Sequence, residues 1–165
     1  MLQLRIAEQN EMIPEDGILT GAIYFELDDG NCFPCEGWVD VPLCVMTWLA
    51  ESALKLYGCT KREARLDFME GPYHVILRRE DDVIHWSFEQ MHPKSVMYIC
   101  DTPYSHLLDL ALIRGTQLCC RASGLQERKQ TEPFDDEPLC ELAAVLQKLL
   151  TARCKEPGNT RGRFS

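Results

Sequence analysis

The stretch Asp40–Gly58, DVPLCVMTWLAESALKLYG, decides how this chain folds. Aspartate is a common helix cap, proline suits a first helical turn, and Gly58 follows the last helical residue. Between the ends the residues are apolar almost all round, with polar breaks at Thr47, Glu51, Ser52 and Lys55. A helix that is apolar on every side is buried. We therefore expect this helix, capped by Asp40, to run through the centre of the core with Trp48 in its middle.

Strand patterns flank this helix on both sides. Alternating apolar residues predict one strand over residues 2–7 and another over 18–27. After the helix, three runs separated by the short turns EGP and EDD predict an antiparallel meander over residues 63–90. Its inward-facing side chains are predicted to be Leu66, Phe68, Val75, Leu77, Ile84, Trp86 and Phe88. A further strand is predicted over residues 95–100, where prolines bound the run on both sides.

The remaining chain has helical patterns. One helix is predicted to start at a cap by Asp101 or Thr102 and to end near Gly124. Gly115 inside it costs about 1 kcal/mol relative to alanine and weakens its continuity. A polar loop is expected over residues 125–134, and a last helix over residues 137–154.

The order of these elements predicts a single α+β domain over residues 1–155, followed by a flexible tail over residues 156–165. The length of 165 residues suits one domain, and the sequence shows no internal repeat. We expect a mostly antiparallel sheet of about five to six strands with three helices packed on one face.

The chain is acidic, with 17 basic and 26 acidic residues and a formal charge of −9. Such a charge repels phosphate backbones and anionic membranes, so neither nucleic acid nor a membrane is expected as a partner. It favours a basic protein partner. No apolar run reaches the roughly 20 residues that span a bilayer, and the first residues lack a signal-peptide pattern. A cytoplasmic location is therefore expected.

Nine cysteines are scattered along the chain and are expected to be free thiols. Cys32 and Cys35 have the C-x-x-C spacing that is typical of redox dithiols and half zinc sites. However, Glu36 favours the thiol over the thiolate, no helix begins at Cys32, and no second ligand pair has zinc-site spacing. We interpret the two as incidental loop thiols and predict neither metal nor cofactor. A thiol-redox or metal-binding protein that uses this pair is one alternative.

A small enzyme is the second alternative. Asp67, Glu70 and His74 surround one predicted turn and have the residue types of an acid/base site. Polar residues at a hairpin tip are, however, usually solvated, and His85 has the pattern of a surface histidine on a strand. The chain contains no nucleophile elbow, P-loop, dinucleotide fingerprint or zinc-protease motif. We therefore expect that the protein is not an enzyme.

Two motifs carry a family resemblance. FPCEGWVD, over residues 33–40, leads into the helix that bears Trp48, and FMEGPY follows over residues 68–73. The pattern F-P-x-x-G-W-x-D, a tryptophan-bearing helix and F-M-x-G-P-Y resembles a group of small bacterial proteins. These are similar to immunity proteins of polymorphic and contact-dependent toxin systems. The resemblance implies an immunity protein that neutralises one cognate toxin by stoichiometric binding.

A basic toxin would meet acidic residues in exposed turns. Three acidic pairs occupy predicted turns or helix starts: Asp28 and Asp29, Asp81 and Asp82, and Asp135 and Asp136. Any single pair is also explained as a solubilising turn. Because the three pairs together supply much of the net charge, we expect at least one of them to lie at the interface.

Overall fold

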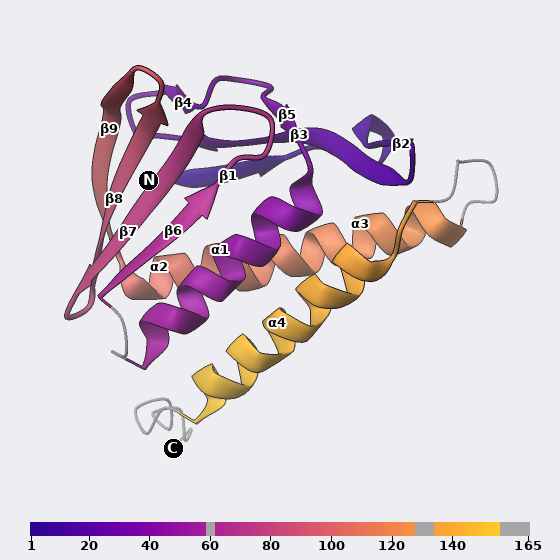
Figure 1. The fold of residues 1–165 in the computed structure, drawn as a ribbon. Helices are drawn as coiled ribbons and strands as arrows, with labels where there is room; N and C mark the ends of the chain where they lie inside the picture. The colour runs from indigo at the N-terminus through magenta and orange to yellow at the C-terminus, as the bar shows by residue number, and fades with distance from the viewer. Residues whose placement is uncertain (59–61, 128–133, 156–165) are drawn as a thin grey trace.

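The computed structural model describes residues 1–58, 62–127 and 134–155, and it confirms the predicted α+β class (Figure 1). The helical elements are η1 (Gln9–Glu11), α1 (Pro42–Tyr57), α2 (Tyr104–Asp109), the π-helical segment η2 (Leu110–Arg114), α3 (Gly115–Glu127) and α4 (Glu137–Cys154). The strands are β1 (Gln3–Ile6), β2 (Ile13–Glu15), β3 (Ile18–Glu26), β4 (Cys32–Phe33), β5 (Val39–Asp40), β6 (Glu63–Asp67), β7 (Tyr73–Glu80), β8 (Val83–Met91) and β9 (Lys94–Pro103). The tail predicted over residues 156–165 lies outside the described residues.

The strands form two antiparallel sheets, where the sequence analysis expected one sheet of five to six strands. In the five-stranded sheet, β1, β2, β4 and β5 all pair with β3. The four-stranded sheet is the predicted meander, extended by β9 in the order β6-β7-β8-β9. Alternating patterns identify strands but do not say which strands pair, and this is why the division into two sheets was not predicted.

Aromatic side chains join the two sheets. The ring of Phe25 from β3 lies 5.7 Å from the ring of Trp86 and 5.4 Å from the ring of Phe88. Phe33 from β4 lies 5.1 Å from Phe88. All seven side chains that were predicted to face inward from the meander are buried. The alternation therefore gave the correct inner face of this sheet.

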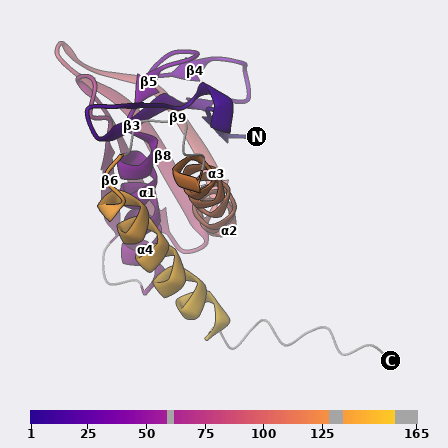
Figure 2. The same ribbon diagram turned by 90° about the vertical axis from the view of Figure 1, so that its right-hand side faces the viewer.

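Helix α1 contacts strands of both sheets and is buried on most sides, as predicted. Trp48 is an exception, because it is only partly buried at the edge of the core. Asp40 does not cap the helix: Val41 occupies the cap position without a side-chain hydrogen bond. Helix α4 begins and ends at the predicted residues, and it packs against α1 and α3 (Figure 2).

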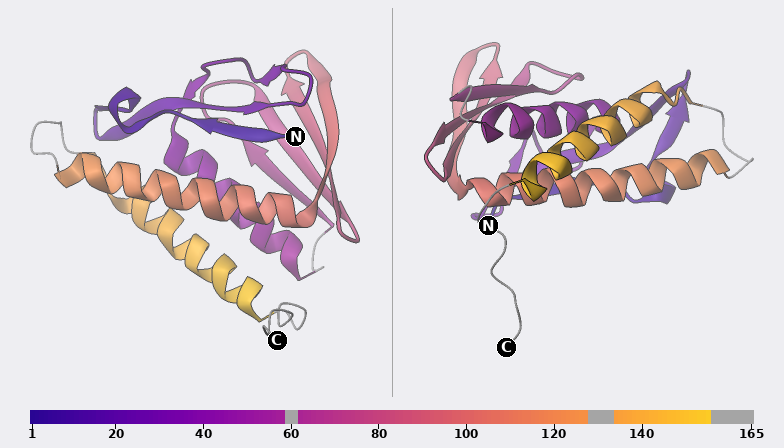
Figure 3. Two further views of the ribbon diagram at one scale, coloured as in Figure 1. Left: turned by 180° about the vertical axis from the view of Figure 1, so that it is seen from behind. Right: turned by 90° about the horizontal axis from the view of Figure 1, so that it is seen from below.

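The segments α2, η2 and α3 follow one another as a continuous helical rod (Figure 3). The predicted caps Asp101 and Thr102 lie in β9 instead, so the helix begins only at Tyr104. Gly115 does not interrupt the rod. It allows α4 to approach, because a Cβ atom at Gly115 would lie 2.8 Å from Cδ2 of Leu146. Part of the loop predicted over residues 125–134 is helical, since α3 continues to Glu127.

The buried apolar side chains of both sheets and all the long helices form one cluster, from Leu2 to Leu149. Among the described helices, none is long and apolar enough to cross a membrane.

Candidate binding groove

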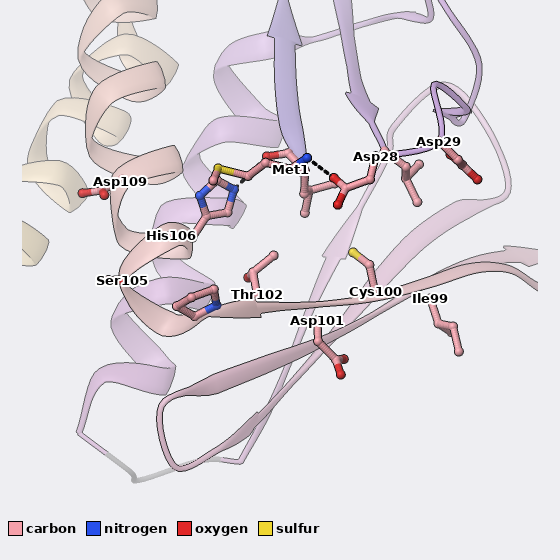
Figure 4. A pocket seen from close by; sticks show the side chains of 13 residues that line it. Met1, Asp28, Asp29, Ile99, Cys100, Asp101, Thr102, Ser105, His106 and Asp109 are labelled. Atoms are coloured by element: carbon pink, nitrogen blue, oxygen red, sulfur yellow. Dashed lines mark hydrogen bonds and ion pairs between the residues drawn. The ribbon is translucent and has the colours of Figure 1, made fainter.

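A hollow of about 650 Å³ lies where the amino-terminal strand and the end of β3 face β9 (Figure 4). One wall is formed by residues 1–2 and 27–29, the other by residues 99–103, and Ser105, His106 and Asp109 of α2 close one end. Cys100 and Thr102 point from β9 toward Met1 and Asp28, whereas Asp101 points to the other side of the strand. We call this hollow the acidic groove.

Four aspartates contribute to the lining of the acidic groove, Asp28, Asp29, Asp101 and Asp109, although the carboxylate of Asp101 points away from it. Asp28 forms an ion pair with the amino group of Met1, and both groups are well exposed. Asp29 accepts hydrogen bonds from the backbone N–H (3.0 Å) and side-chain amide (2.7 Å) of Asn31. These bonds lower the pKa of Asp29, so its charge is present at neutral pH.

The other two carboxylates have cationic or titratable partners. An oxygen of Asp101 lies 2.8 Å from Nδ1 of His85, on the side of β9 that faces away from the groove. Asp109 accepts a hydrogen bond of 3.0 Å from Arg153. Both carboxylates stay about half exposed or more, so a partner reaches them without unfolding any part of the structure.

Burial and the negative charge of the groove both act on the thiol of Cys100. Burial raises the pKa of its thiol to about 11, and the carboxylates of Asp28 and Asp101 add to the increase. At neutral pH the thiol is therefore protonated and a poor nucleophile.

The structure places the three predicted acidic pairs on separate parts of the molecule (Figure 1). Only Asp28 and Asp29 line the groove. Asp81 and Asp82 form the β7–β8 turn. Asp135 and Asp136 precede α4, where a side-chain oxygen of Asp135 accepts the N–H of Glu137 at 3.0 Å.

Sequence reasoning missed Asp101 and Asp109 as groove residues. Asp101 was read as a helix cap, although β9 continues past it. Asp109 lies inside a helix and carries no local signal. Their position beside the groove depends on how β9 and α2 pass the end of the first sheet, and no short stretch of sequence encodes that arrangement.

The residues of the two sequence motifs lie together and support the fold. Oδ2 of the fully buried Asp40 accepts two backbone N–H groups at the β6–β7 turn, from Met69 at 3.0 Å and from Glu70 at 3.2 Å. The ring of Trp38 covers Gly71, where a Cβ atom would lie 3.0 Å from that ring. The motifs therefore explain how the hairpin docks onto the first sheet, and they contribute no residue to the groove.

The cysteines Cys32 and Cys35 are both unbridged. Burial, followed by the charges of Glu36 and Glu26, raises the pKa of the Cys32 thiol. A redox dithiol needs the opposite shift. Within residues 1–58, 62–127 and 134–155, no group of three or more His, Cys, Asp or Glu side chains is placed to hold a metal ion.

Replacing both Cys32 and Cys35 by serine should leave the free energy of unfolding within about 0.5 kcal/mol of the wild type. The reason is that neither thiol is bridged and neither is fully buried. Urea denaturation and zinc analysis of the purified protein check this. About one zinc per chain that disappears in the double variant would establish the metal-binding alternative instead.

Asp67 and His74 of the proposed acid/base trio are cross-strand partners of β6 and β7, but within the described residues no hydrogen bond joins members of the trio. His74 is buried, and its Nε2 lies 3.2 Å from Glu89, a residue that the sequence analysis did not consider. Asp67 is held by Arg65, and the Glu70 backbone is held by Asp40. The hydroxyl of Ser87 donates to Glu89 and not to His74, so this chain of contacts lacks the order of a nucleophile and its base.

Together, the fold and the groove define an α+β protein with an acidic concave surface beside a sheet edge. Comparison of the chain with protein-family models, with curated proteins and with solved structures found no match. Any functional assignment must therefore come from the groove and from the sequence motifs.

Proposed function

We propose that this chain is a non-enzymatic, acidic binding protein of the bacterial immunity type. It neutralises one cognate toxin by stoichiometric binding, and the acidic groove receives a basic part of the toxin. The observation that carries the proposal is the combination of a hollow of about 650 Å³ with four aspartates in its lining. The net charge of −9 and the sequence motifs support it.

The groove suits recognition of a lysine or arginine side chain. Asp28 and Asp109 lie at different ends of the hollow, and Leu2, Leu27 and Ile99 are among the apolar residues that line it. An alkyl stem packs on such surface while its charged end reaches a carboxylate. Binding of this kind needs no cofactor and no reaction, since the toxin is blocked when its basic surface is covered. The encounter is proposed to take place in the cytoplasm.

Changing Asp28 and Asp29 together to asparagine should slow association with the toxin about threefold to tenfold at low salt, and leave dissociation less affected. Charges at the rim of an interface mainly act during the encounter. The matched variants change Asp81 with Asp82 and Asp135 with Asp136, and we expect smaller effects from both. An immunity gene lies directly downstream of its toxin gene, so association with the product of that neighbouring gene is measured over a salt series. Thermal melts control for the loss of the hydrogen bond that Asp135 accepts from Glu137.

The outcomes of this experiment test the position of the interface, the role of charge and the immunity proposal itself. A larger effect of the Asp81 and Asp82 variant would move the interface to the β7–β8 turn. If none of the three variants changes the rate or its salt dependence, the electrostatic account is wrong. If the neighbouring gene product does not bind at all, the immunity proposal fails.

A further inference from the structure

We propose that the free edge of β9 binds an extended, lysine- or arginine-bearing segment of the partner as an added β-strand. The inference rests on the proposed function, because it specifies how the acidic groove holds its partner. It concerns the part of β9 that lines the groove, residues 99–103.

Strand β9 ends the four-stranded sheet, and within the described residues it pairs with β8 alone. Backbone groups alternate in direction along an antiparallel strand. The N–H of Met91 donates to Pro72 on β7, so the odd-numbered residues of β8 face β7 and the even-numbered ones face β9. Trp86 is therefore hydrogen-bonded to Cys100, and the N–H and C=O groups of Ile99 and Asp101 point to the free edge.

The opposite edge of the same sheet, strand β6, is covered by a helix. There, α1 packs against β6, and the hydroxyl of Ser52 donates to the C=O of Arg65 at 3.4 Å. At β9 the edge carries exposed apolar side chains, with Ile99 75% and Val96 58% exposed. Exposed apolar residues on an edge strand favour pairing with another chain.

Only part of β9 is suited to pairing. The register with β8 shifts between Phe88 and Glu89, and Pro103 has no N–H to donate. A shift of this kind and a terminal proline both limit how far a further strand can extend. The regular segment between them, residues 98–102, is the segment beside the groove.

The carboxylates on both faces of β9 favour a basic segment as the added strand. Side chains of an added strand alternate between the two faces of the sheet. On the inner face they meet the groove and Asp28, and on the outer face they meet Asp101. A basic residue thus finds a carboxylate on either face. A second copy of this chain is disfavoured, because it brings a further charge of −9 and a second Asp101 to the same edge.

The test uses a capped peptide of about eight residues that alternates lysine with valine and threonine, and a matched peptide with glutamate in place of lysine. With the lysine peptide, we expect shifts of the Ile99 and Asp101 amide resonances and slower hydrogen exchange at both amides. The glutamate peptide should produce neither effect. Amide shifts confined to other residues would overturn the proposal.

A backbone variant tests the pairing itself. Ile99→Pro removes an N–H at the free edge and keeps the ladder to β8, whereas the control Ile99→Thr keeps the N–H. We expect Ile99→Pro to weaken binding of the lysine peptide and of the toxin at least about fivefold, and Ile99→Thr to change it little. Because Ile99→Pro also restricts the backbone of β9 itself, the exchange measurement on the wild type stands as an independent test.

The experiments distinguish a failure of strand addition at β9 from a failure of the immunity function. If the neighbouring gene product binds Ile99→Pro and Ile99→Thr equally well, strand addition is wrong and the immunity function stands. If that product does not bind while the lysine peptide still protects Ile99 and Asp101, the immunity function is wrong and strand addition stands. Sedimentation that shows a dimer dissociated by Ile99→Pro would assign the edge to a second copy and overturn the proposed occupant.

Discussion

Replacing Asp40 by alanine is expected to lower the free energy of unfolding by about 3–5 kcal/mol. Asp40 is fully buried, and four N–H groups donate to its carboxylate. The indole of Trp38 donates at 3.2 Å and the backbone of Val41 at 2.7 Å. The backbones of Met69 and Glu70 donate from the β6–β7 turn. Alanine leaves these donors without their acceptor, and the cost is greatest where the bond is buried, as at Val41.

Urea denaturation of Asp40→Ala and Asp40→Asn measures the effect. Asparagine keeps one carbonyl oxygen but presents its NH₂ group to the remaining donors, so we expect a loss that is smaller than for alanine and still clear. The control is Asp67→Ala. Asp67 also lies in this hairpin, but its carboxylate is partly exposed and is bonded to Arg65. Its loss should stay below about 1 kcal/mol. Equal losses for Asp40→Ala and Asp67→Ala would show that Asp40 does not dock the hairpin.

Local patterns predicted most of the elements of this fold. The bounds of α4 and the inner face of the meander follow from periodicities of 3.6 and 2 residues, which neighbouring side chains impose on their own segment. The helix α1 was placed correctly for the same reason. Trp48 was not, because a helix that is apolar on nearly all sides does not show which of its sides faces the solvent.

The features that were not predicted all depend on contacts between distant segments. Asp40 was assigned to the helix that follows it, although its partners Met69 and Glu70 come from the next hairpin. The division into two sheets depends on the partners of β3, and the acidic groove on the passage of β9 beside Asp28. One of the three acidic pairs named from the sequence lines the acidic groove, and the position of the groove was not predicted.

Trp86→Ala is expected to have an effect as large as that of Asp40→Ala, about 3–5 kcal/mol. Trp86 is 1% exposed, and its ring stacks on Phe88 with centroids 6.1 Å apart. Its indole N–H donates to the hydroxyl of Thr102 at 2.8 Å. Alanine creates a cavity between the two sheets and leaves the hydroxyl of Thr102 without this donor.

The matched control is Trp48→Ala, which truncates the same residue type at a site that is only partly buried. We expect Trp48→Ala to cost clearly less than Trp86→Ala in urea denaturation, because less apolar area and no comparable cavity are involved. Thr102→Val separates the hydrogen bond from the packing, since it keeps the shape of the side chain and removes the acceptor of the indole N–H. Thr102 also lines the acidic groove, so Trp86 links the core to the strand that the partner is proposed to bind. A greater loss for Trp48→Ala than for Trp86→Ala would mean that α1, and not the contact between the two sheets, holds the centre of the core.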